Sequence, residues 1–435
     1  MKDASIFQRI GGVLYFPAPG GDSSVGGDMR LALWGLVVGL LSGSVISVFR
    51  ITTSMAFNAV GSWFRAHAGD PLQCLLWLIP AVIAALITGY FMRDPAIRSG
   101  AGAWVTQALA GPQKHVWARI LVPKFLGTWL VMACGLSVGR EGPCIQMGAS
   151  TALGLACLDG GGDAATHAAK RRMLVLCGCA AGLAGAFSAP FAGIFYVIEV
   201  LKERITRSLL ILMLGAALGV YLSATCVFGL GLMLPLKGSA LPELRYLWNS
   251  ILVGLGAGFV GVIYAGMLRR SLALYARGRR FPVMLRPLLP FLGAAVMLFI
   301  YPQATGEGLS IFTAMEAGTV ASILLAFLCA KLLFTAFCYG SGVPAGVMVP
   351  ILALGGVAGG LCAMGFAAAG IAGGGGMGAF ITMGMASAFA AAEHAPLTSI
   401  VLVLEMTGAY TATPGLLVSS CVAVLLARGI RARPV

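Results

Sequence analysis

The sequence predicts an all-α protein that crosses a lipid bilayer several times. Of its 435 residues, 59% are hydrophobic and 10% are charged, whereas soluble domains contain roughly 25% charged residues. Several stretches also approach the roughly 20 apolar residues that a helix needs to cross about 30 Å of hydrocarbon. The clearest of these stretches are Leu31–Phe49, Leu75–Met92, Leu209–Leu230, Ile251–Met267 and Ser322–Phe337. Because one span would be only an anchor, this many spans predict a transport-type bundle.

The positive charge indicates how the chain is placed in the membrane. The net charge is +14 at pH 7, but the basic residues gather between apolar stretches and form no stripe interleaved with aromatic residues, so we expect no nucleic-acid partner. Arginines are densest from Arg269 to Arg286, which we take as one inter-helix loop, and short loops rich in Lys and Arg stay in the cytoplasm. We therefore expect a prokaryotic plasma (inner) membrane protein with both termini in the cytoplasm.

An internal repeat divides the chain into two related halves. Five landmarks of the first half recur in the second at a spacing of 207 or 206 residues, a register that chance does not readily produce. The pairs are Gly139 with Gly346, Pro143 with Pro350, Gly148 with Gly355, Pro190 with Pro396, and Glu199 with Glu405. Repeats in membrane proteins use broken helices to aim N-termini at an anion in mid-membrane. We expect such helices here and favour an inverted second half, because an odd number of intervening spans turns one copy over.

The expected layout follows from the repeat. It has a cytoplasmic N-terminal segment over 1–29, a first membrane half over 30–230, a second half over 231–429 and a short cytoplasmic tail over 430–435, with no appended soluble regulatory domain. The four histidines lack the spacing of a zinc site, and no reactive pair of side chains stands out. We therefore expect no cofactor, no metal and no enzymatic activity.

Glu141 is the most informative residue of the first half. It lies between Gly139-Arg140 and Gly142 and separates two long apolar runs, and a carboxylate at membrane depth is costly without a function. The flanking glycines let main-chain amides approach a ligand closely, and an anion held there would compete with the carboxylate for the same N–H groups. The alternative is a glutamate at the end of a loop that only pairs with Arg140.

The second half contains a matching, uncharged turn. Gly340–Pro344 and the following Ala345–Pro350 are rich in glycine and lead into a helix, so they offer several N–H donors without a countercharge. Such dipoles hold a halide weakly enough for it to leave again. Glu199 follows Pro190 by nine residues, about 13 Å along a helix, and is either part of a proton path or a carboxylate at a helix end near water.

Together these motifs resemble the CLC family of chloride channels and chloride/proton antiporters. The segments that carry the resemblance are Gly139–Pro143 with Gln146–Gly148, Gly340–Pro350, Ala395–Thr398 and Leu404–Thr407. The resemblance implies a homodimer of chains with tilted and broken helices, one anion pathway per subunit, and Glu141 as gate and proton carrier. It also implies that the main chain at Gly346, Val347 and Met348 binds the anion, with Gly139, Arg140 and Gly142 beside Glu141. A first filter is expected at Ser99 and Gly100.

Three departures from the family pattern keep alternatives open. No proline follows the turn at Ser99, and the chain ends at Pro434-Val435, where an anion-coordinating tyrosine of the family would follow the last span. The inner proton glutamate of many family antiporters is Val200 here. Chloride/proton exchange is the favoured function, and a passive chloride channel is the alternative. A fluoride/proton antiporter is less favoured, since Pro143 is kept and no Asn occupies the first filter. A membrane protein without transport function is also less favoured.

Overall fold

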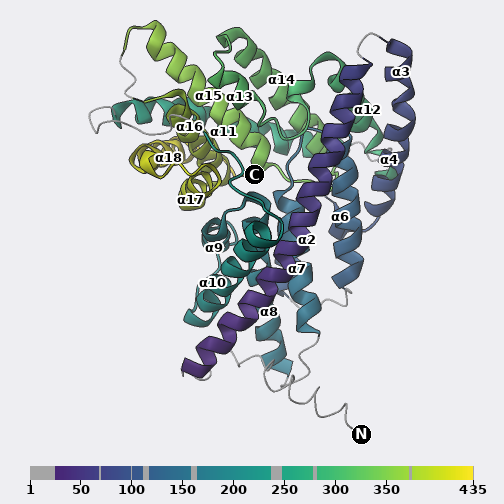
Figure 1. Cartoon of the computed structure of the whole chain (residues 1–435), viewed down its shortest axis with the longest axis vertical. Coiled ribbons are helices and arrows are strands. Elements are labelled where there is room, and N and C mark those ends of the chain that lie inside the picture. Colours follow the sequence, from purple (N-terminus) through teal and green to yellow (C-terminus); the bar gives the residue numbers. More distant parts are fainter. Residues whose placement is uncertain are drawn as a thin grey trace. The chain divides into compact units, whose positions relative to one another are not determined.

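The computed structural model is built mainly from helices (Figure 1). It describes residues 25–67, 70–98, 100–110, 117–157, 164–236, 247–277, 282–371 and 375–434. No β-strand forms within these residues, where extended segments meet at an isolated antiparallel bridge between Gly139 and Gly346. The prediction of an all-α protein is confirmed.

Helices of very different length follow one another along the chain. The first are α2 (Val25–Ala66), α3 (Pro71–Leu76), α4 (Leu78–Phe91), α5 (Gly102–Ala110), α6 (Trp117–Ala133), α7 (Glu141–Ala156), α8 (Ala164–Phe187), α9 (Pro190–Glu199) and α10 (Arg207–Tyr221). A π-helical segment, Leu222–Val227, extends α10. The remaining ones are α11 (Leu247–Arg277), α12 (Leu288–Ile300), α13 (Ile311–Glu316), α14 (Ala321–Gly340), α15 (Met348–Ala368), α16 (Met377–Glu393), α17 (Pro396–Thr407) and α18 (Thr413–Gly429).

Seven helical segments among the described residues are long and apolar enough to cross a membrane, by length and composition. They contain α2, α10 with its π-helical extension, α11, α12, α14, α15 and α18. Three of the five stretches expected to span fall within them, and a fourth, Leu209–Leu230, extends past the end of its segment at Val227. The fifth is broken at Trp77 into α3 and α4, because Pro80 has no N–H to bond the carbonyl of Leu76 in a continuous helix. The chain is a multi-pass membrane protein.

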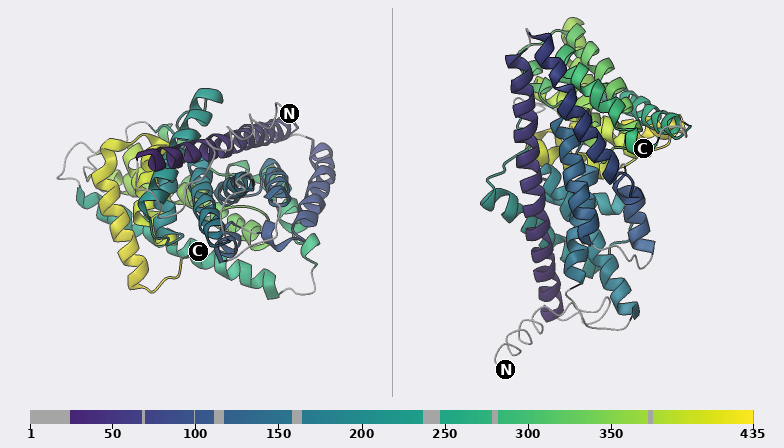
Figure 2. Two further views of the ribbon diagram at one scale, coloured as in Figure 1. Left: turned by 90° about the horizontal axis from the view of Figure 1, so that it is seen from below. Right: turned by 90° about the vertical axis from the view of Figure 1, so that its right-hand side faces the viewer.

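Helix lengths agree with the expectation of tilted and broken helices. α2 is a single helix of 42 residues (Figure 2), about 63 Å long at 1.5 Å per residue. This length is about twice the hydrocarbon thickness, so α2 can cross only with strong tilt or by extending beyond the bilayer. In contrast, α9 and α17 have 10 and 12 residues, too few to cross it.

The arginine cluster differs from the expectation that it forms a loop. Arg269, Arg270 and Arg277 lie in the last turns of α11, whereas Arg279 and Arg280 are outside the described residues. The helix continues past its apolar part because neither Gly nor Pro interrupts Leu268–Arg277 and because Arg, Leu and Ala are strong helix formers.

The described chain divides into two compact units. Unit 1 is made from Met1–Val48, Ala101–Pro123 and Cys144–Gly231, and unit 2 from Phe49–Gly100, Lys124–Pro143 and Leu232–Val435. Each unit has its own apolar core, which includes Leu176 and Leu212 in unit 1 and Phe291 and Phe334 in unit 2. The site described below lies within unit 2.

Glycines bring helix backbones close together inside each unit. In unit 2, a Cβ atom on Gly355 of α15 would collide with the carbonyl oxygen of Gly384 in α16, and a Cβ atom on Gly384 would collide with the carbonyl oxygen of Gly355. In unit 1, a Cβ atom on Gly148 of α7 would likewise collide with the carbonyl oxygen of Gly178 in α8, and a Cβ atom on Gly178 with that of Gly148. Small residues allow this close helix packing in membranes. The two pairs repeat at the spacing found in the sequence, and the pair in unit 2 holds α16 directly against α15.

Candidate functional site

Two turns of the same conformation lead into α7 and α15. After α6 and after α14, a glycine adopts the left-handed conformation with φ of +81°, at Gly135 and at Gly342. Residues with a side chain rarely adopt this conformation. The chain then enters α7 at Glu141 and α15 at Met348. Because both pairs of positions are 207 residues apart, the structure repeats at the spacing found in the sequence.

A reciprocal pair of hydrogen bonds joins the two turns. The N–H of Gly139 donates to the carbonyl oxygen of Gly346 at 2.8 Å, and the N–H of Gly346 donates to the carbonyl oxygen of Gly139 at 2.7 Å. The bonded residues occupy equivalent positions in the two halves and run antiparallel, as expected around a local two-fold axis. The bridge brings the first turn of α7 next to the first turn of α15.

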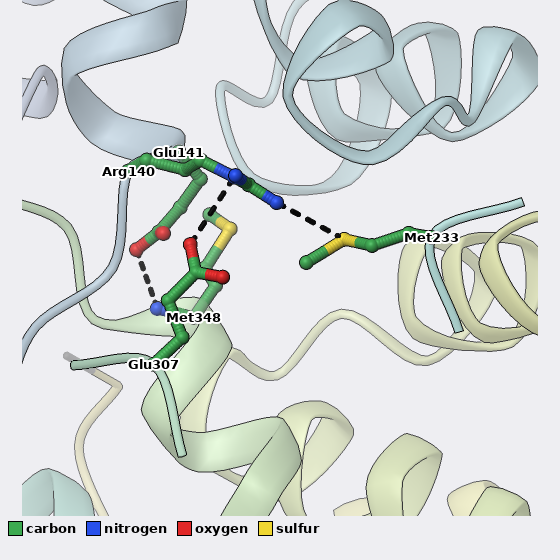
Figure 3. A network of polar contacts seen from close by, with 5 residues as sticks. All are labelled: Arg140, Glu141, Met233, Glu307 and Met348. Atoms are coloured by element: carbon green, nitrogen blue, oxygen red, sulfur yellow. Dashed lines mark hydrogen bonds and ion pairs between the residues drawn. The ribbon is translucent and has the colours of Figure 1, made fainter. Parts of the chain in front are cut away.

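The Glu141 carboxylate lies against the first turn of α15 (Figure 3). The N–H of Met348 donates to its Oε1 at 2.5 Å, and the amides of Val347 and of Glu141 itself also interact with the carboxylate. Glu141 is only 1% exposed. N–H groups at the start of a helix have no partner within that helix and attract anions. The carboxylate is therefore an anion held by main-chain donors.

Gly139 and Gly346 leave open the space that the carboxylate fills. A Cβ atom on Gly346 would collide with Oε1 of Glu141, and a Cβ atom on Gly139 would collide with Oε2. The N–H of Gly346 is already used in the bridge to Gly139. The contribution of Gly346 to the site is thus its missing side chain, while Val347 and Met348 supply the donors.

Tyr264 of α11 orients the peptide group that faces the carboxylate. Its buried hydroxyl donates to the carbonyl oxygen of Val347 at 2.7 Å. The C=O of Val347 and the N–H of Met348 belong to one planar trans peptide group and point in opposite directions. Fixing the carbonyl on one side therefore directs the Met348 N–H toward Glu141 on the other side.

Arg140 points away from the carboxylate beside it (Figure 3). Its Nε lies 3.1 Å from Oε1 of Glu307, and its Nη2 donates to the sulfur of Met233 at 3.6 Å. The ion pair of Arg140 is thus with Glu307, and the alternative in which Glu141 only pairs with Arg140 is not what the structure contains.

The Arg140–Glu307 pair lines a cavity of about 550 Å³. Asn58, Arg65 and Gln303 also contribute to its wall, whereas Glu141 does not. Two arginines against one glutamate leave the lining with a net positive charge. Because Arg140 is paired with Glu307, Arg65 supplies the excess positive charge, which favours anions in the cavity next to the turn that carries Glu141.

Two buried lysines also belong to unit 2, and the sequence analysis did not identify them. Lys124 of α6 donates to the carbonyl oxygen of Ile97 at 3.0 Å, and Lys331 of α14 donates to the carbonyl oxygens of Ala304 and Gly306. Neither lysine is exposed. They are 207 residues apart, so a lysine in each of two apolar runs at the spacing of the repeat was a signal that could have found them.

The other predicted site residues are distributed differently. Gly142 lies buried in the first turn of α7, and the amide of Gly100 interacts with the hydroxyl of Tyr339 in α14, both within unit 2. Ser99 lies outside the described residues. Glu199 ends α9 in unit 1, followed by Val200 as the C-cap. Among the described residues, no three His, Cys, Asp or Glu side chains gather as metal ligands.

Comparison with known proteins identifies relatives over most of the chain. The sequence model of the family described as voltage gated chloride channel matches residues 80–428. The chain is 29% identical over 418 residues to a protein of Vibrio parahaemolyticus named H(+)/Cl(-) exchange transporter ClcA, covering 92% of this chain and 86% of that protein. A protein of the same name from Vibrio cholerae is 30% identical over 418 residues, with the same coverage.

Solved structures show the same fold. A slow cyanobacterial Cl-/H+ antiporter superposes with a TM-score of 0.84 at 24% identity, covering 93% of this chain and 96% of that one. A CLC-type fluoride/proton antiporter superposes with a TM-score of 0.75 at 24% identity, covering 94% and 98%. At this level of identity the likeness concerns the fold, and it confirms the predicted CLC-type architecture.

Proposed function

This chain belongs to the voltage gated chloride channel family, and we propose that it exchanges chloride for protons across a bacterial inner membrane. Relatives that match nearly its whole length are named H(+)/Cl(-) exchange transporters. The substrates of the proposed reaction are chloride, or a similar small anion, and protons. The chain would accordingly be a transporter and not an enzyme.

The observation that carries the proposal is the Glu141 carboxylate among main-chain donors. Its oxygen occupies a place that a chloride ion could take, since the same N–H groups would hold either anion. An anion and the carboxylate exclude each other, so Glu141 acts as a gate. Protonation removes its charge-assisted hydrogen bonds, which are roughly twice as strong as neutral ones, and lets the side chain leave. Because each protonation opens the gate, the same side chain can carry protons.

The remaining site residues take supporting roles in this proposal. Val347 and Met348 bind the anion through their amides, and Gly346 and Gly139 provide the space for it. Arg140 and Gly142 flank the gate, and Ser99 with Gly100 form the first filter. Glu199 is a candidate for the proton path. We also propose a homodimer with one anion pathway in each subunit.

Passive chloride conduction is the second candidate function, and Val200 is the observation that favours it. A valine cannot carry a proton at the position where many family antiporters have an inner glutamate. In a channel of this kind Glu141 would still gate the pathway, but proton movement would not be tied to chloride movement.

Flux measurements on the purified protein in liposomes would distinguish these functions. Chloride efflux and proton uptake are recorded together under a chloride gradient, and fluoride replaces chloride in a parallel series. Protons driven against their own gradient by chloride identify an exchanger, and chloride efflux without proton movement identifies a channel. Absence of any anion flux from correctly folded protein would contradict both.

A separate prediction concerns orientation in the membrane. The arginine cluster at the end of α11 and both chain termini should face the cytoplasm, because Lys and Arg in short connections set topology. Within unit 2, Arg269 donates to the carbonyl oxygen of Pro434 at 2.9 Å, which supports a common side for the cluster and the C-terminus. Cysteines introduced at Arg277 and at Arg433 should resist impermeant thiol reagents in intact cells and react after permeabilisation. Labelling of either position in intact cells would reverse the orientation.

A further inference from the structure

A carboxylate with no role in the site described above lies at the C-terminal end of α16. Glu393 is the last residue of this helix. Its neighbours Ala391, Ala392 and Ala395 are at most 1% exposed, while Glu393 itself is partly exposed. The negative end of the helix dipole disfavours an anion there, and carboxylates inside membrane proteins are costly and usually functional. We therefore expect Glu393 to have a function other than packing.

Glu393 interacts with Glu141 itself and with two tyrosines that also interact with Glu141. Its carboxylate interacts electrostatically with that of Glu141 and with the hydroxyls of Tyr264 and Tyr339. Tyr264 is the residue that orients the Met348 amide, and Tyr339 interacts with Gly100. Glu393 makes no hydrogen bond or ion pair with another described residue. Among the residues that the structure describes, this carboxylate thus has no countercharge, and it interacts electrostatically with Glu141.

The packing of α16 explains why Glu393 comes near the gate. α16 packs on α15, which begins at Met348, and on α11, which carries Tyr264. α15 contains no acidic or basic residue. The charged groups of the other helices packed on α16, Glu316 of α13, Glu405 of α17 and Arg428 of α18, are not among the groups that act on Glu393.

Glu393 and Glu307 interact with Glu141 through different surroundings. Glu307 pairs with Arg140, interacts with Lys331 and lines the cavity. Glu393 interacts with the two tyrosines and is absent from the cavity wall. Glu141 is therefore the one group with which both carboxylates interact. This is expected if Glu307 and Glu393 lie on two separate pathways that lead to Glu141.

The internal repeat shows that the fold does not require a carboxylate at this position. The residue equivalent to Glu393 in the first half, 206 positions earlier, is Phe187, which ends α8 and is fully buried. The next residue is left-handed in both copies, with φ of 54° at Ser188 and 57° at His394. The same local structure thus forms with an apolar side chain, so the carboxylate is an addition specific to the second half.

We propose that Glu393 is the second proton-transfer group of this protein and relays protons between Glu141 and water. The proposal rests on the proposed exchange function. The proton leaves the carboxyl group of Glu141, which becomes anionic, and is taken up by the Glu393 carboxylate, which becomes neutral; the reverse transfer restores the first state. Glu141 is 1% exposed, whereas Glu393 is partly exposed at the end of α16, so in this proposal Glu393 is the group that exchanges the proton with water. Val200 has no such capacity.

The test is the dual flux measurement in liposomes on wild type, Glu393→Gln and Glu393→Asp. Loss of a proton-transferring side chain typically costs roughly 100-fold or more, so chloride-driven proton flux should fall by about that factor in Glu393→Gln while chloride flux stays in the wild-type range. Glu393→Asp keeps a carboxylate and should retain measurable coupling. Glu316→Gln alters an exposed glutamate of α13 and serves as the control, with unchanged fluxes.

The outcomes separate this inference from the proposed function. If wild type moves chloride without protons, the exchange function fails. If wild type is coupled and Glu393→Gln keeps its proton flux, the relay assignment is overturned while exchange stands. Loss of coupling in Glu199→Gln but not in Glu393→Gln would assign the relay to Glu199 instead. A parallel fall of both fluxes in folded Glu393→Gln would place Glu393 in the anion pathway and likewise overturn the relay.

Discussion

Replacing Glu141 by glutamine should abolish proton coupling while chloride flux persists. Glutamine keeps the shape of the side chain but cannot be protonated or carry a negative charge. Proton flux should therefore fall by at least roughly 100-fold, the usual effect of removing a proton-transferring group. Chloride flux should continue, because a neutral amide competes for the Met348 N–H with bonds only about half as strong as those of a carboxylate. The dual liposome assay measures both quantities.

The same variant should also remove the pH dependence of chloride flux. In wild type, flux should rise as the pH falls, because protonation releases the carboxylate from its main-chain donors. Glu141→Gln should give a flat profile, and Glu316→Gln should keep the wild-type profile. Proton-coupled exchange that survives in Glu141→Gln would contradict the assignment of the gate. Strong acid activation in wild type without coupling would identify a channel-like protein in which Glu141 is only a gate.

Replacing Gly346 by alanine should weaken chloride binding sharply. The added Cβ atom would occupy the position of Oε1 of Glu141, so neither the carboxylate nor an anion could sit there without displacing its surroundings. Overpacking of this kind costs roughly 1–3 kcal/mol, which corresponds to a loss of chloride affinity between about fivefold and a hundredfold. Calorimetric titration of the purified protein with chloride measures the change.

The matched control for this experiment lies on the same helix. Gly365 of α15 has no atom within 4 Å of an added Cβ atom, so Gly365→Ala should leave chloride affinity unchanged. Met348→Leu should also be mild, since Met348 contributes its main-chain N–H to the site. Gly346→Pro should have a larger effect than alanine, because it also removes the N–H that bonds Gly139. Wild-type affinity in a folded Gly346→Ala protein would place the anion site elsewhere.

Several buried or partly buried charged residues of unit 2 were not predicted from the sequence. Lys124 and Lys331 obey the repeat spacing and lie in apolar runs, so pattern alone could have identified them. Glu307 and Glu393 have no equivalent acidic residue at that spacing, and each lies more than 160 residues from Arg140 or Glu141 along the chain. Glu307 lies between α12 and α13, and Glu393 ends α16. Their proximity to Glu141 depends on tertiary packing, which a single sequence does not specify.

The sequence by itself determined the membrane class and the repeat, and it singled out Glu141 as the proposed gate. Low charge and long apolar runs indicate a chain that lies in a bilayer. The cost of a carboxylate at membrane depth pointed to Glu141, and the repeat pointed to the matching turn at Gly346–Met348. Only the tertiary structure decided which groups meet: the bridge between Gly139 and Gly346, the Tyr264 hydroxyl that orients the Met348 amide, and the pairing of Arg140 with Glu307 instead of Glu141. Composition and spacing can be read from the residues one by one. These contacts instead join residues far apart in the chain, and they form only once the helices pack, with glycines such as Gly139 and Gly346 where a side chain would collide.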